Sequence, residues 1–178
     1  MIIEGKAAEK KGLKQVAELI CVAARTAPKG KGVDNIVTAV ISDESLEKLQ
    51  KEMYRIADEE GAEFFRRDAG CLENTPYIVL IGTKIEPVGV APCGYCGYLN
   101  CKENKKNNGI CAFNTGDLGI AIGSAVSKAA DFRVDNRVLF TAGKAALNLG
   151  FLGEEVKIAY GIPLTSSGKN IFFDREKK

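Results

Sequence analysis

Four cysteines lie within one short stretch of the chain, and this stretch constrains its folding more than any other feature. They are Cys93, Cys96, Cys101 and Cys111, spaced C-x2-C-x4-C-x9-C within 19 residues. Because the loops between them are short, bringing all four thiolates to one metal centre costs little chain entropy. Thiolates bind zinc and hold iron–sulfur clusters. The stretch therefore predicts a metal centre with these four residues as ligands.

The residues between the cysteines favour a 4Fe-4S cluster. Glycine follows both Cys93 and Cys96, which allows the backbone to fold closely around the sulfurs and to point N–H groups at them. A four-cysteine zinc site usually contains a second C-x2-C pair, which this chain lacks. A structural zinc site and free, redox-active thiols remain the alternatives.

The amino-acid composition excludes several kinds of metal site, catalysis and binding partner. The chain contains no histidine, which excludes mixed Cys/His zinc sites and imidazole as a general acid or base. With 178 residues it can bury a core of its own, so a metal is not needed merely for folding. The formal net charge of +2 indicates neither nucleic acid nor a membrane surface as a partner.

The N-terminal sequence predicts a cytoplasmic protein. Residues 1–14 lack the apolar segment of a signal peptide, and the chain has no apolar run of the roughly 18 residues that a membrane span needs. In the reducing cytoplasm, clustered cysteines favour a metal site over disulfides.

Hydrophobic patterning predicts one α+β domain over residues 1–178, with 84–113 as an inserted, cysteine-rich metal-binding loop. The apolar run at 76–81 is typical of a strand buried on both faces. Gly119 and Gly123 lie one helical turn apart, and we expect them to allow close helix packing in the core. Helices are expected at about 9–26, 42–61, 62–68, 115–130 and the second half of 136–150, and strands at 35–41, 76–81 and 156–160.

The cysteine stretch resembles a known type of iron–sulfur domain. Residues 93–101 read C-G-Y-C-G-Y-L-N-C, similar to the C-G-x-C-G-x-x-x-C core of 4Fe-4S domains in anaerobic electron-transfer and carbon-monoxide/acetyl-CoA enzymes. In those domains the fourth cysteine usually lies farther downstream than Cys111 does here. Cys71 is the reserve candidate for the fourth ligand.

The rest of the chain resembles flavin-dependent nitroreductases. Residues 23–35, A-A-R-T-A-P-K-G-K-G-V-D-N, are similar to their A-A-x-x-A-P-S-x-x-N segment, and D-L-G-I-A-I-G-S-A at 117–125 and Y-G-I-P at 160–163 sit where that fold has its central helix and a late strand end. As a whole, the chain resembles the uncharacterised ferredoxin-domain proteins of anaerobes. The resemblance implies a nitroreductase-like α+β fold, a mixed, mainly antiparallel sheet flanked by helices, and a homodimer with FMN at its interface.

The resemblance also implies where FMN would bind. Residues 1–13 lack the R-x-S-x-R segment with which nitroreductases hold the flavin phosphate, and Lys29 replaces the serine of the A-P-S turn. Asp117, Asp135 and Arg137 are candidate acid-base residues by resemblance only, and we assign none of them. The expected FMN ligands are Arg25, Lys29, Lys31, Asn35, Lys169 and Arg175.

Two functions remain open at this point. The first is an FMN-dependent oxidoreductase whose cluster exchanges electrons with a redox partner protein or a small electron acceptor. The second is an electron carrier or redox sensor that has lost the flavin. The adjacent Phe172 and Phe173 need burial, and a C-terminal arm that crosses onto a second subunit would provide it.

Overall fold

Four strands form one sheet at the centre of the structure, a computed structural model that describes residues 2–173. The strand order is β1-β2-β4-β3, and every neighbouring pair among the described residues is antiparallel. The predicted α+β class with a mainly antiparallel sheet is thus confirmed. The strands are β1 (Ile36–Ile41), β2 (Tyr77–Lys84), β3 (Asp135–Asn136) and β4 (Val156–Thr165).

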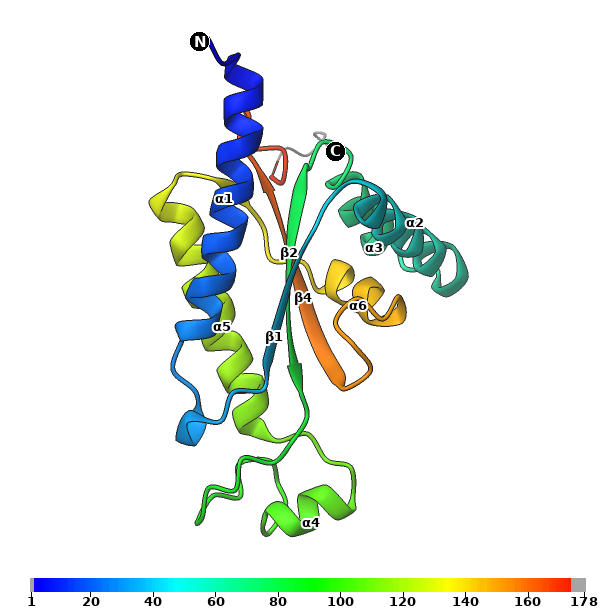
Figure 1. Cartoon of the computed structure of the whole chain (residues 1–178). Helices are drawn as coiled ribbons and strands as arrows, with labels where there is room; N and C mark the ends of the chain where they lie inside the picture. The colour runs from blue at the N-terminus through cyan, green and yellow to red at the C-terminus, as the bar shows by residue number, and fades with distance from the viewer. Residues whose placement is uncertain (1, 174–178) are drawn as a thin grey trace.

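Helices cover both faces of the sheet (Figure 1). On one face, α1 (Gly5–Thr26) and α5 (Ala112–Asp131) pack side by side and bury one hydrophobic core against the strands. A second core lies under α2 (Asp43–Glu60), α3 (Glu63–Gly70) and α6 (Phe140–Asn148). Since both faces are covered, β2 is buried along its whole length up to Lys84, as its apolar sequence predicts.

Local signals explain several element ends. Helix α1 ends at Thr26 because Ala27 precedes Pro28 and adopts an extended conformation. Helix α2 ends at Gly61, whose φ of 63° is the left-handed conformation that glycine adopts at helix ends.

Other boundaries differ from the sequence-based expectation. Helix α5 begins at Ala112 with Cys111 as its N-cap, three residues before the expected Thr115. Its first turns are held by tertiary contacts, because the buried Asn114 side chain accepts a hydrogen bond from the Glu86 N–H at 3.0 Å. Strand β4 continues to Thr165, five residues beyond the expected end. Helix α4 (Cys101–Lys106), strand β3 and the 3-10 turn η1 (Gly30–Gly32) were not predicted.

The expectation for Gly119 and Gly123 is wrong. Both residues are exposed on the outer face of α5, and a Cβ added at either would meet no atom within 4 Å. Buried side chains of α5, such as Leu118 and Ala121, make the contacts with the core instead. The small residues therefore leave an open helix face on the surface.

The two adjacent phenylalanines that we expected a second subunit to bury differ from one another, because Phe172 is buried whereas Phe173 is 62% exposed. Phe172 is buried by its own chain, and Arg137 donates a hydrogen bond to its carbonyl oxygen at 3.0 Å. The Asn170 side chain donates a hydrogen bond to the Asp135 carboxylate at 2.9 Å. Burial of Phe172 thus needs no second subunit. The expected FMN ligand Arg175 lies outside the described residues.

Within residues 2–173, no helix has the combination of length and apolar character that crossing a lipid bilayer requires.

Candidate functional site

The segment between β2 and α5 carries the four clustered cysteines and projects beyond the end of the sheet (Figure 1). Its only helix among the described residues is the short α4. The side chains of Cys93, Cys96, Cys101 and Cys111 line one cavity of about 490 Å³. The fold therefore brings together the four residues that the spacing C-x2-C-x4-C-x9-C singles out.

Turns and helix starts position the sulfurs around this cavity. Gly94 and Gly97 adopt φ values of 81° and 82°, which only glycine tolerates readily, and the Gly97 N–H closes the turn onto the Gly94 carbonyl at 2.9 Å. Cys101 begins α4, where the Asn100 side chain caps the helix by accepting from the Glu103 N–H at 3.0 Å.

Cys111 occupies a different environment from the other three cysteines. It is buried, with 6% of its surface exposed, whereas Cys93 is exposed. It is also the N-cap of the 20-residue helix α5. The dipole of a long helix favours negative charge at this end, as a metal-bound thiolate or an anionic cluster supplies.

Four cysteine sulfurs are a donor set for either a zinc ion or an iron–sulfur cluster. A zinc ion requires its four sulfurs at about 2.3 Å from one point. Within residues 2–173, no three Cys, Asp or Glu side chains come close enough to hold one metal ion. The four thiols are spread around the cavity of about 490 Å³ and are not gathered at one point.

The two remaining cysteines lie away from this cavity. Cys71 ends α3, and its thiol lies 3.7 Å from the Arg67 carbonyl oxygen. Cys21 lies in α1, packs against the hydrophobic core, and has a raised pKa because burial disfavours the thiolate. Neither residue lines the cavity. The cavity therefore includes Cys111 and does not include Cys71.

Asn104 is a cavity residue that the sequence interpretation missed. Its side chain is 1% exposed and lines the cavity, and its Nδ2 donates to the Ile110 carbonyl at 3.3 Å. Its Oδ1 is buried without a hydrogen-bond partner in the structure. The available signal was its position three residues after Cys101, which puts both side chains on the same side of a helix.

A second cavity of about 380 Å³ adjoins the first. Phe113 and Ala112 line both cavities, so one layer of side chains separates them. Tyr95 stacks on Phe113 with ring centroids 6.3 Å apart and an interplanar angle of 10°. The lining of the second cavity is largely apolar and includes Pro28, Gly30, Tyr95, Phe113, Asp117 and Ile120.

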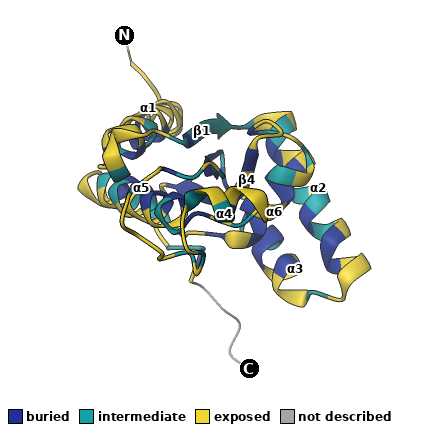
Figure 2. Ribbon diagram, turned by 90° about the horizontal axis from the view of Figure 1, so that it is seen from below, coloured by how far each residue is buried: buried dark blue, intermediate teal, exposed yellow. Residues whose placement is uncertain are grey.

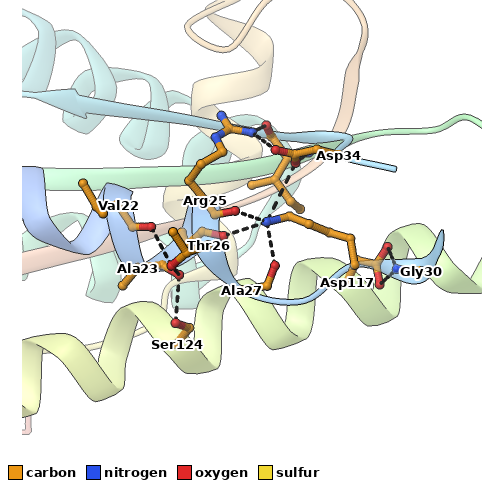
Figure 3. Close-up of polar contacts among 12 residues, drawn as sticks. Val22, Ala23, Arg25, Thr26, Ala27, Gly30, Asp34, Asp117 and Ser124 are labelled. Carbon is orange, nitrogen blue, oxygen red and sulfur yellow. Dashed lines mark hydrogen bonds and ion pairs between the residues drawn. The ribbon is translucent and has the colours of Figure 1, made fainter. Parts of the chain in front are cut away.

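A close contact between the loop after α1 and helix α5 forms one wall of this second cavity (Figure 3). The Gly30 N–H donates to both carboxylate oxygens of the buried Asp117, each at 3.1 Å. A Cβ at position 30 would lie 2.7 Å from a ring carbon of Phe113, so glycine alone fits without displacement of the ring. Asp117 therefore has a structural role in holding the loop.

The two expected FMN ligands at the end of α1 are engaged elsewhere in the fold, as Figure 3 shows for Arg25. Arg25 donates to Asp34 and to the Ile36 carbonyl, each at 2.6 Å. The side chain of Lys29 lines the second cavity, but its ammonium group donates to carbonyl groups at the end of α1. These acceptors are the carbonyl oxygens of Ala24 at 3.2 Å, Ala27 at 2.8 Å and Arg25.

The other expected ligands are dispersed. Lys31 donates to the Gly89 carbonyl at 3.2 Å and so ties the loop after α1 to the cysteine-containing segment. Asn35 lies just before β1, where its carbonyl oxygen accepts from the Lys84 N–H at 3.0 Å. Lys169 is exposed in the C-terminal segment. Of the expected FMN ligands that the structure describes, only Lys29 lines the second cavity.

Replacing Lys29 with methionine should destabilise the fold by about 2 kcal/mol, because a buried cation that satisfies three helix-end carbonyl groups is lost. The Lys29 side chain is only 6% exposed. Lys31→Met is the matched control, since the Lys31 ammonium makes one exposed contact, and we expect a change below about 0.5 kcal/mol. Urea unfolding measures both, and equal effects would contradict this role of Lys29.

The ion pair of Arg25 with Asp34 should make stability depend on acidic pH. Burial disfavours the charged Asp34 carboxylate, but hydrogen bonds from Arg25 and the Ile36 N–H and the charges of Arg25 and Lys29 outweigh it and lower its pKa. Such a carboxylate stabilises the fold above its unfolded pKa of about 4, and this contribution is lost as the pH falls toward the folded pKa.

Asp34→Asn should therefore reduce the loss of stability below about pH 4, by no more than about 1 kcal/mol because the Asp34 side chain is 34% exposed and screened by solvent. Urea unfolding as a function of pH measures this. An unchanged pH dependence in the variant would exclude Asp34 as its source.

Solved flavoproteins share this fold. A nitroreductase with bound FMN from Desulfitobacterium hafniense superimposes with a TM-score of 0.60 at 14% identity, over 87% of this chain and 78% of its own. A structure described as a nitroreductase in complex with FMN, from Desulfovibrio desulfuricans, gives 0.60 at 15% identity, over 92% and 79%. A BluB-like flavoprotein from Clostridium difficile gives 0.55 at 18% identity, over 100% and 87%. The predicted nitroreductase-like fold is thus confirmed.

Sequence comparison identifies the family. A protein of Archaeoglobus fulgidus is 37% identical over 186 residues, and the alignment covers 100% of both chains. Residues 107–175, which include Cys111 and helix α5, match the family described as "Uncharacterized protein containing a ferredoxin domain (DUF2148)". The chain belongs to this ferredoxin-domain family, as its motifs predict.

Proposed function

We propose that this is a redox protein that holds a 4Fe-4S cluster through Cys93, Cys96, Cys101 and Cys111. The observation that carries the proposal is the single cavity that all four side chains line. The ferredoxin domain in the description of the family supports a redox role. A cluster of this kind exchanges single electrons, and the chain supplies four thiolates and a partly enclosed, largely apolar site for it.

FMN in the second cavity is the second part of the proposal. The stacked rings of Tyr95 and Phe113 and an apolar lining suit a flat aromatic ring system. Structural neighbours are described with bound FMN, which supports a flavin here. Because the Lys29 ammonium faces α1, we expect the phosphate to extend beyond the cavity.

The exposed face of α5 is the surface on which we expect a homodimer to form. Gly116, Gly119 and Gly123 lie on it with open space around them, and Ile120 is 49% exposed. Gly116 and Ile120 also line the second cavity, so a second copy packed on this face would enclose a ligand there. Small residues allow close approach of a partner helix.

Ile120→Glu tests this arrangement. The variant should sediment as a monomer and lose FMN while it keeps its iron, because the cysteine cavity does not include Ile120. Phe64→Glu is the matched control, since Phe64 on α3 has a nearly equal exposure of 48% on the other side of the sheet. A dimeric, flavin-containing Ile120→Glu protein would exclude α5 as the interface.

A carrier or sensor without flavin is the second candidate function. It is favoured by the engagement of Arg25 and Lys29 with Asp34 and the end of α1, which removes them as phosphate ligands. Flavin content distinguishes the two functions, because the carrier would neither contain FMN nor take it up when the cofactor is added.

Metal analysis tests the cluster itself. Protein purified without oxygen should contain iron and acid-labile sulfide in equal amounts and show the broad visible absorption of a 4Fe-4S cluster. One zinc per chain with neither iron nor sulfide would instead establish a structural zinc site.

A further inference from the structure

We propose that the surface around the cysteine cavity is a docking site for an acidic electron-carrier protein. We call this surface, formed by residues 84–111, the cluster face. Its use as an electron-transfer interface depends on the proposed 4Fe-4S cluster, whereas the docking itself follows from the surface chemistry described next.

The cluster face carries three exposed large hydrophobic residues. The part of this face around α4 is turned toward the viewer in Figure 2. Leu99 and Tyr95 are 88% and 81% exposed, and Ile110 is 53% exposed. Leu99 lines the cysteine cavity, so this apolar surface begins at the metal site itself. Large apolar side chains grouped on an exposed segment mark a protein contact, because isolated ones are common but grouped ones leave an unfavourable surface in water.

Lysines accompany these apolar residues. Lys102 and Lys106 lie one turn apart on α4, both are exposed, and neither has a carboxylate partner among the described residues. Lys102 also lines the cavity. Lys105 differs from them because it forms an ion pair with Glu86 at 2.7 Å.

The segment that forms this face carries a small excess of positive charge, although Lys84 pairs with Glu155 outside the segment. Residues 84–111 contain four lysines and two glutamates, a net charge of +2 that equals the formal charge of the whole chain. The remaining residues are therefore neutral as a group. A cluster held by four thiolates would bring negative charge of its own into the cavity, but the exposed ammonium groups of Lys102 and Lys106 lie where a docked protein meets them.

An apolar centre with a basic rim fits a protein with an acidic rim rather than a small molecule. Leu99 and Ile110 are exposed side chains that a flat protein surface can cover. Interfaces between electron-carrier proteins are small, and complementary charge makes the encounter of the two proteins rapid and specific. We infer that the partner carries a cluster of carboxylates around its own redox centre.

Charge reversal on α4 provides the test, with a small acidic ferredoxin as the probe. Lys102→Glu combined with Lys106→Glu should raise the Kd for the ferredoxin at low salt by about tenfold or more. Lys10→Glu combined with Lys14→Glu is the matched control. These lysines are also one turn apart and exposed, but on α1, at the other end of the molecule from α4 (Figure 1). The control should remain within about twofold of the unmodified protein.

Three further measurements make the result decisive. Binding of the unmodified protein should weaken steeply between low and physiological salt, because exposed charges are screened. Basic cytochrome c should bind less well than the acidic ferredoxin. Lys102→Gln with Lys106→Gln should give an intermediate Kd, which covers the case that the reversal variant folds poorly. Absence of ferredoxin binding, salt-independent binding, or equal Kd values for the α4 and α1 variants would each overturn the docking proposal.

The same preparations separate this proposal from the proposed function. Iron and sulfide content report on the cluster, and Kd reports on docking. A protein with iron and sulfide whose Kd is insensitive to the α4 charges would retain the cluster and lose the docking site. A charge-dependent Kd in protein without iron or sulfide would support the docking surface and overturn the cluster.

Discussion

Cys96→Ser should lower the iron and sulfide content of anaerobically purified protein at least about tenfold, since even outer-sphere changes at metal sites cost about 10- to 100-fold in affinity. Cys96 lies between Gly94 and Gly97, in the turn beside the cavity. Its thiol is one of the four that line the cavity. Serine preserves the size of the side chain but removes the soft sulfur ligand. The loss should be visible as disappearance of the cluster absorption.

Two other cysteines provide the controls for this experiment. Cys21→Ser and Cys71→Ser should retain iron and sulfide, because neither residue lines the cavity. Loss of the cluster in Cys71→Ser together with its retention in Cys111→Ser would show that Cys71 is the fourth ligand. Cys111 would then line the cavity without being a ligand. Circular dichroism of each variant separates cluster loss from unfolding.

Gly143→Ala should destabilise the protein by about 3 kcal/mol or more, the largest effect we expect from a single methyl group. Gly143 lies in α6, where the helix backbone crosses β4 so closely that a Cβ would lie 1.9 Å from the Ala159 carbonyl oxygen. The obstacle is backbone in the middle of the sheet, so no side-chain rotation can relieve the clash. Helix and strand would have to separate.

Gly12→Ala is the matched control for this prediction. Gly12 also lies within a helix, α1, but a Cβ there meets nothing within 4 Å. Alanine should stabilise the protein by about 0.5 to 1 kcal/mol at this position, through its higher helix propensity. Thermal or urea unfolding measures both changes, and a neutral Gly143→Ala would show that α6 and β4 are not in contact in solution.

Sequence signals that act on neighbouring residues predicted the corresponding helix ends and strand well. The apolar run of β2, the proline after α1 and the glycine after α2 act on their immediate neighbours, so the strand and both helix ends appear where expected. The early start of α5 and the extension of β4 depend on contacts with other segments. No pattern within those segments indicates such contacts.

The expected FMN ligands also show how local sequence differs from tertiary contacts in what it predicts. Arg25 and Lys29 look like free cations in the sequence, but the fold brings Asp34 and the end of α1 to them. Phe113 lies between the two cavities only because Gly30, 83 positions earlier in the chain, packs against its ring. Such pairings depend on how α1 and α5 lie together, so they could not be derived from either segment alone.

The sequence by itself determined which four thiols come together, because four thiols within 19 residues remain near one another in any compact fold. Periodic apolar residues also predicted the α+β class, whereas the mainly antiparallel sheet was implied by the resemblance to nitroreductases. Only the tertiary structure decided which surfaces stay open. The outer face of α5 and the cluster face are exposed because the cores on both sides of the sheet are filled by other side chains. Burial is a property of the whole packed chain, and no single segment encodes it.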